Sequence, residues 1–126
     1  MERFLYNKLK KWKDSKSRKP LILEGARQVG KTWLLKQFGK NEFENFIYIN
    51  CDNNPQIESI FIDYDVKRIL RNISAISNTK IESGKCLIVF DEVQEFPKVL
   101  TSLKYFCEES PEIHIAAAGS LLGILD

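Results

Sequence analysis

A glycine-containing segment that ends in lysine and threonine is the first place where this sequence could do chemistry. Residues 25–32 read Gly-Ala-Arg-Gln-Val-Gly-Lys-Thr and match the spacing GxxxxGKT. Such a loop lets consecutive backbone N–H groups converge on phosphate oxygens at the positive end of a helix. Lys31 adds a cation for the β and γ phosphates, and the Thr32 hydroxyl offers one coordination site to Mg²⁺. The segment therefore predicts a site for the triphosphate of a purine nucleotide, with Mg-ATP as the expected ligand.

Two acidic residues, Asp91 and Glu92, follow directly on the most apolar run of the chain, residues 86–90. A parallel strand delivers its last residue to the carboxyl edge of a sheet, where the phosphates are expected. There the Asp91 carboxylate can hold Mg²⁺, through water or by way of Thr32, and Glu92 can orient and deprotonate the attacking water. Taken alone, the acidic pair would be interpreted as a turn or helix cap. Together with the glycine loop, we favour metal binding for Asp91 and catalysis for Glu92.

The segments around these motifs alternate between strand-like and helix-like patterns. Gly39 is expected to stop the helix that follows the glycine loop, and the strand before the loop is expected to be buried. The helices are expected at 4–13, at 29–38, as two short helices within 57–76 that break near 63–65, and from Pro97 onward. The strands are expected at 21–23, 46–49, 86–90 and 113–118. This alternation predicts an α/β fold, a three-layer α/β/α sandwich with a mainly parallel sheet.

The composition fits one domain and argues against several classes of protein. The chain has 126 residues, 44% of them hydrophobic, and 19 basic against 17 acidic residues give a net charge of +2. A charge this small creates no strong field for nucleic acid. The basic stretch 8–19 leaves nucleic acid as a weakly supported partner, against a solvated helix face and linker. Without a signal peptide or an apolar run of about 20 residues, we expect a cytoplasmic location and no membrane partner.

The cysteines and the single histidine are interpreted as structural. Cys51, Cys86 and Cys107 are widely spaced and odd in number, which indicates buried, reduced thiols rather than a disulfide framework. His114 starts an apolar run and is expected to be a packed, hydrogen-bonded side chain rather than a ligand or base.

Three segments, taken in order, resemble a known family of ATPase domains. They are GARQVGKT (25–32), CLIVFDEVQEFP (86–97) and HIAAAGS (114–120). They resemble the AAA-type ATPase domain of prokaryotic proteins in which a P-loop domain precedes a C-terminal domain of unknown function. The resemblance covers nearly the whole chain. It implies the P-loop NTPase fold of the additional-strand type, with a strand inserted between the P-loop strand and the acidic strand.

The resemblance also implies roles for individual residues. Ser120 takes the place of a residue that senses the γ phosphate, although Asn or Thr is usual there and a helix cap is the alternative. Asn50 takes the place of a residue that restrains the catalytic glutamate, with an ordinary strand-end asparagine as the alternative. The expected catalytic residues are Glu92, Lys31, Ser120 and Asn50, and the expected metal ligands are Thr32 and Asp91. The expected nucleotide-binding residues are Gly25, Ala26, Arg27, Gln28, Val29, Gly30, Lys31, Thr32 and Trp33.

Family members carry a fifth strand, a helical lid and usually an arginine given to a neighbouring subunit's nucleotide, and no candidate for these follows residue 120. We therefore expect residues 1–126 to be one truncated ATPase domain, with 1–19 a basic amphipathic helix and linker. The isolated chain is expected to bind ATP weakly and hydrolyse it slowly, because an arginine finger contributes several powers of ten in rate. The parent protein is expected to couple ATP hydrolysis to movement of an attached C-terminal domain, and a homo-oligomer is compatible with the family.

Other classes of protein fit the sequence less well. A GTPase would continue from Asp91 as DxxG and carry an NKxD motif, whereas Glu92 follows here. A helicase needs a second motor domain, and a nucleotide kinase needs an arginine-rich lid. The remaining alternative is a nucleotide-gated binding module, a switch that holds ATP without significant turnover.

Overall fold

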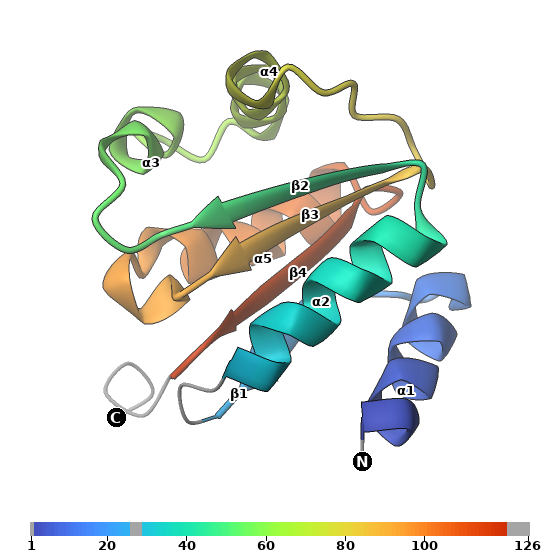
Figure 1. The fold of residues 1–126 in the computed structure, drawn as a ribbon. Helices are drawn as coiled ribbons and strands as arrows, with labels where there is room; N and C mark the ends of the chain where they lie inside the picture. Colours follow the sequence, from blue (N-terminus) through green and yellow to red (C-terminus); the bar gives the residue numbers. More distant parts are fainter. Residues whose placement is uncertain (1, 26–28, 121–126) are drawn as a thin grey trace.

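The described residues form one parallel sheet with helices on both faces (Figure 1). The computed structural model describes residues 2–25 and 29–120. The strands are β1 (Leu21–Glu24), β2 (Asn45–Asn50), β3 (Cys86–Asp91) and β4 (His114–Gly119), in the sheet order β1-β4-β3-β2. The helices are α1 (Glu2–Asp14), α2 (Val29–Glu42), α3 (Pro55–Ile60), α4 (Val66–Ser77) and α5 (Lys98–Glu109), with a 3₁₀ turn η1 (Val93–Glu95). All pairings between neighbouring strands are parallel, so the predicted α/β class and sandwich are confirmed.

Strand β3 lies inside the sheet, and helices cover both of its faces. All six of its residues are buried. Leu87 and Val89 pack in the layer formed with α1 and α2, whereas Ile88 and Phe90 pack in the layer formed with α3, α4 and α5. Successive side chains of a strand point to opposite faces, so an unbroken apolar run is what a strand buried on both faces requires.

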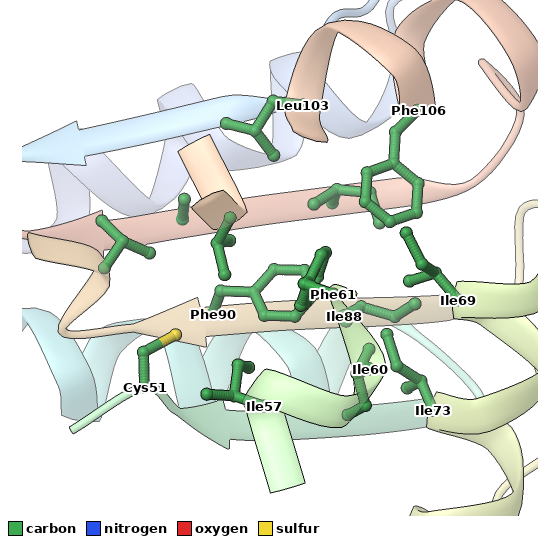
Figure 2. Packing of buried hydrophobic residues seen from close by; sticks show 14 of the residues in the cluster. Cys51, Ile57, Ile60, Phe61, Ile69, Ile73, Ile88, Phe90, Leu103 and Phe106 are labelled. Carbon is green, nitrogen blue, oxygen red and sulfur yellow. The ribbon is translucent and has the colours of Figure 1, made fainter. Parts of the chain in front are cut away.

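The layer on the α3–α5 side is built around aromatic and branched side chains (Figure 2). The rings of Phe61 and Phe90 meet edge to face with their centroids 5.7 Å apart. Ile57 and Ile60 from α3 and Ile73 from α4 are buried in the same cluster. This packing holds the two short helices over the part of the sheet that contains β2 and β3, the strand that carries Asp91.

The predicted break between the two short helices is confirmed. Helix α4 starts after Asp65, whose carboxylate accepts the N–H of Arg68 at 3.2 Å as an N-cap. The Arg68 guanidinium reaches back to the Ile60 carbonyl at 2.7 Å and to the Asp63 carboxylate at 2.8 Å. The cap and this arginine fix the turn between the helices.

Two expectations about the first strand–helix unit were wrong. Helix α2 does not stop at Gly39 but runs to Glu42, because Gly39 does not adopt the left-handed conformation of a glycine that ends a helix. Gly39 lies against the ring of Phe46, where a Cβ would come within 2.7 Å of the ring Cγ. The glycine serves close packing inside the helix rather than its termination. Strand β1 is not buried: Ile22 is 48% exposed, because β1 pairs only with β4 in the described sheet and lies at its edge.

Helix α1 belongs to the packed structure, as its amphipathic pattern predicts. Leu9 is 1% exposed in the cluster with α2, and the Tyr6 hydroxyl donates to the Glu42 carboxylate at 2.7 Å. Arg18, from the basic stretch, donates to the carbonyl of Pro111 at 3.0 Å and so ties the linker to the residues before β4. Among residues 2–25 and 29–120, no helix has both the length and the apolar character that a membrane crossing requires.

The structural interpretation of His114 is confirmed. This side chain is 4% exposed, its Nε2 lies 3.0 Å from the Lys13 carbonyl, and the rings of Trp12 and Phe43 meet it edge-on.

The cysteines are reduced, as expected, but only two of them are buried. All three thiols are free. Cys51 and Cys86 are buried, whereas Cys107 is half-buried because it lies on α5 at the border between the packed face and solvent.

Candidate nucleotide-binding site

The glycine that follows β1 allows the chain to turn tightly beside the predicted lysine. Gly25 has φ +155°, a conformation that L side chains rarely adopt, and its N–H donates to the Gly119 carbonyl at 3.3 Å. A Cβ at position 25 would overlap Lys31 Nζ and lie 3.1 Å from its Cε. The Lys31 ammonium donates to the Glu24 carbonyl at 2.9 Å, so the lysine folds back over the turn. Any other residue at position 25 would displace the Lys31 side chain.

Helix α2 begins where the motif predicts a phosphate-binding helix. Ala26, Arg27 and Gln28 lie outside the described residues, and α2 starts at residue 29. A Cβ built on Gly30 would meet no atom of the described residues within 4 Å. Trp33 is 52% exposed on the following turn. The partial positive charge of a helix N-terminus favours an anion in such a position.

The central contact of the site joins the glycine-loop helix to the end of β3. Thr32 Oγ1 donates to Asp91 Oδ2 at 2.8 Å, although the two residues are 59 positions apart. Tyr48, on β2, donates its hydroxyl to the same carboxylate oxygen at 2.6 Å, and the Glu92 N–H donates to Oδ1 at 2.9 Å. Three donors therefore hold the Asp91 carboxylate, which is only 6% exposed.

Tyr48 is a site residue that the sequence did not indicate, because a tyrosine in a strand usually serves packing. Burial and its hydrogen bond to the Asp91 carboxylate raise the pKa of Tyr48 well above its usual range, so the hydroxyl stays a donor. Burial, with the charges of Asp91 and Glu92, also raises the pKa of the Cys51 thiol to about 12. Both groups lie beside concentrated negative charge.

The donor set fits a metal ion that is bound together with phosphates. Mg²⁺ is usually held by one or two carboxylates, waters and substrate phosphates rather than by an all-protein cage. Asp91 and Thr32 supply one carboxylate and one hydroxyl that already lie in contact. Within the described part of the chain, no group of three or more His, Cys, Asp or Glu side chains forms a separate metal cluster.

Glu92 adopts a backbone conformation that is rare for a residue with a side chain. Its φ of 56° and ψ of 44° lie in the left-handed region, at a cost of about 1–2 kcal/mol. The turn is held by Asp91 Oδ1 and by the Glu95 N–H, which donates to the Glu92 carbonyl at 3.0 Å. Unfavourable backbone conformations of this kind cluster at functional sites.

Gln94 is the second site residue that sequence reasoning missed. Its side-chain Nε2 donates to Glu92 Oε1 at 2.7 Å, and its Oε1 accepts the backbone N–H of Ser120 at 3.1 Å. The available signal was an amide two residues after the glutamate, inside the segment quoted for the family resemblance. The spacing alone could not place it, because the partner after β4 is 26 positions away.

Ser120 and Asn50 lie at the expected edge of the sheet without a demonstrated role. Ser120 follows β4, and its backbone N–H is bonded to Gln94. Asn50 ends β2 in register with Asp91, but its Oδ1 accepts the Asp52 N–H at 2.9 Å in a local turn. Their roles in sensing phosphate and restraining Glu92 stay predictions.

The fold and the site define the class as a P-loop nucleotide-binding domain of the additional-strand type, because β4 lies between the P-loop strand β1 and the acidic strand β3. The chain belongs to a family of AAA domains, which matches residues 17–126. The family resemblance of the three motifs is thereby confirmed, and membership assigns the chain to nucleotide-binding domains of ATPase type. A search of the curated proteins found no match.

Proposed function

We propose that this site binds Mg-ATP and that Glu92 activates water for hydrolysis of the γ phosphate. The observation that carries the proposal is the 2.8 Å contact between Thr32 Oγ1 and Asp91 Oδ2. It places the Thr32 hydroxyl and the Asp91 carboxylate close enough together to bind the same Mg²⁺ ion. The AAA family membership supports a nucleotide as the ligand.

The residues around this contact have complementary tasks in the proposal. Lys31 exchanges the Glu24 carbonyl for phosphate oxygens, which as anions are stronger acceptors. Thr32 and Asp91 would hold Mg²⁺, which neutralises charge on the phosphates. Glu92, next in the chain, accepts a proton from water as a general base. Movement of an attached domain or partner on hydrolysis is part of the same proposal.

A second candidate function, a nucleotide-gated switch without significant turnover, is favoured by one contact. Gln94 Nε2 occupies one oxygen of the Glu92 carboxylate at 2.7 Å. The switch would result if this bond turned the carboxylate away from the γ phosphate once nucleotide is bound, so that the site bound ATP without hydrolysing it.

Thermal unfolding of the chain tests binding. Mg-ATP is expected to raise the melting temperature, since a ligand at 100 times its Kd stabilises by about 2.7 kcal/mol. ATP without Mg²⁺ should stabilise less. Lys31→Ala should abolish the increase, and Lys40→Ala, an exposed lysine on the same helix, should retain it. Equal melting temperatures with and without Mg-ATP would refute the proposed ligand.

Phosphate release under single-turnover conditions separates hydrolysis from switching. Glu92→Gln removes the base but keeps the side-chain size, and should lower the rate by about 10²-fold or more while Mg-ATP still stabilises the chain. If neither protein releases phosphate while binding is intact, the switch is favoured over the ATPase, whereas identical measurable rates would refute Glu92 as the base.

A further inference from the structure

The amide of Gln94 connects two parts of the site, the Glu92 carboxylate that follows β3 and the Ser120 backbone that follows β4. Its Nε2 donates to the Glu92 carboxylate at 2.7 Å and its Oε1 accepts the Ser120 N–H at 3.1 Å. A carboxylate only accepts and a backbone N–H only donates, so the two partners permit one orientation of the amide. Reversing the amide would place its oxygen against the Glu92 carboxylate oxygen and its NH₂ group against the Ser120 N–H.

The backbone beneath Gln94 is firmly held. Gln94 lies in η1, where the Phe96 N–H donates to the Val93 carbonyl at 3.1 Å and the Val93 side chain is fully buried. The backbone that carries the Gln94 side chain is therefore fixed by the core. The two partners of the amide, Glu92 and Ser120, lie at the ends of β3 and β4.

The end of β4 is shaped to receive this amide. Gly119 has φ +156°, and a Cβ there would overlap Gln94 Oε1 and approach the Val93 N atom to 3.0 Å. The Gly119 carbonyl also accepts the Gly25 N–H at 3.3 Å. The contacts therefore run without interruption from the glycine loop through the end of β4 and Gln94 to Glu92.

We propose that Gln94 is a positioning residue that holds the Glu92 carboxylate and makes its position depend on the end of β4. Nucleotide phosphate that displaces Gly119 or Ser120 would move the amide oxygen and, through the same rigid amide, the donor that holds Glu92. The inference deepens the regulation of the proposed ATPase site and rests on the catalytic role proposed for Glu92. It assigns to Gln94 no contact with the reacting atoms.

An NMR measurement on the nucleotide-free chain tests the connection without requiring hydrolysis. Glu92→Ala is expected to shift the backbone amide resonance of Ser120, because it frees the amide that binds this N–H. In a Gln94→Leu background the same substitution should leave the Ser120 resonance unchanged. Glu95→Ala, a neighbouring carboxylate in η1, is the control and should not shift it. If Glu92→Ala in the wild-type background leaves the Ser120 amide resonance unshifted, the proposal is overturned.

Kinetics test the positioning role. Gln94→Leu should lower kcat by about 10²-fold, the typical cost of misplacing a catalytic group by about 1 Å, and leave KM unchanged. In a Glu92→Gln background it should have no further effect, because the two substitutions disable the same group. Gln94→Glu keeps the shape but replaces the donor with an oxygen, and should reproduce the loss if Gln94→Leu fails to fold.

The two proposals fail in different ways. An unchanged kcat in Gln94→Leu, or additive losses with Glu92→Gln, would contradict positioning by Gln94 even in an active ATPase. A chain that releases no phosphate even under single-turnover conditions would refute hydrolysis by this chain, and the Ser120 resonance would then decide the connection on its own.

Discussion

The Tyr48 hydroxyl donates to the same oxygen of Asp91 that accepts the Thr32 hydroxyl, at 2.6 Å and 2.8 Å respectively. One carboxylate oxygen thus joins β2, β3 and α2. Tyr48→Phe should lower the free energy of unfolding by about 1.5–3 kcal/mol, because it removes a hydrogen bond to a charged group. Denaturant unfolding measures the change.

A double-mutant cycle separates this bond from ring packing. Tyr48→Phe and Asp91→Ala should be strongly non-additive, because each removes the hydrogen bond between these two side chains. Tyr105→Phe is the matched control: its ring stacks on Tyr64 with centroids 5.1 Å apart, and we expect a change within about 0.5 kcal/mol. A Tyr48→Phe protein as stable as the wild type would show that the hydroxyl contributes nothing to the site.

The two glycines of the loop should respond differently to alanine. Gly25→Ala should destabilise the ligand-free chain and weaken Mg-ATP binding, because φ is +155° and the Cβ would overlap the Lys31 ammonium. Gly30→Ala meets no neighbour among the described residues and lies in α2, so it should stabilise the ligand-free chain by up to about 1 kcal/mol. Thermal unfolding of both variants without nucleotide checks the contrast, and equal destabilisation by both would contradict it.

Gly39→Ala should destabilise the chain although alanine is the better helix former. The gain in helix propensity is about 1 kcal/mol, but a Cβ would press on the Phe46 ring, and overpacking typically costs about 1–3 kcal/mol. Adding Phe46→Leu should recover part of the loss by vacating the space. If Gly39→Ala instead raises the melting temperature, the close packing of helix on strand is not the reason for this glycine.

The free energy of unfolding should fall as the pH drops from about 7 to about 5.5, the range in which histidine titrates. Burial lowers the pKa of His114 below its ordinary value of 6.5, so the unfolded chain binds the proton first. The free energy of unfolding is therefore highest above pH 6.5 and falls as the pH drops toward the pKa of His114 in the folded chain. His114→Gln, which keeps a donor for the Lys13 carbonyl, should flatten this dependence in denaturant unfolding at each pH. An unchanged slope in the variant would assign the pH effect to other groups.

Much of the fold, and the pairing of Thr32 with Asp91 in the site, can be predicted from local sequence patterns. The apolar run of β3 predicts a strand buried on both faces, and Thr32 and Asp91 were expected to share a metal because their motifs have known spacing. The spacing of apolar residues that marks a helix or a strand involves only residues close together in the chain, so it can be recognised in the sequence without the tertiary structure. The same reasoning failed at Gly39, because the Phe46 ring that packs against it comes from the next strand.

From the sequence alone we expect a glycine loop, a cation, a hydroxyl and two carboxylates to meet at one edge of a parallel sheet. The contacts that hold these groups in place become visible in the folded structure. Tyr48 reaches Asp91 from β2, and Gln94 links Glu92 to Ser120 at the end of β4. Hydrogen bonds between side chains on different elements depend on strand order and on the direction of each side chain, and no local pattern encodes either.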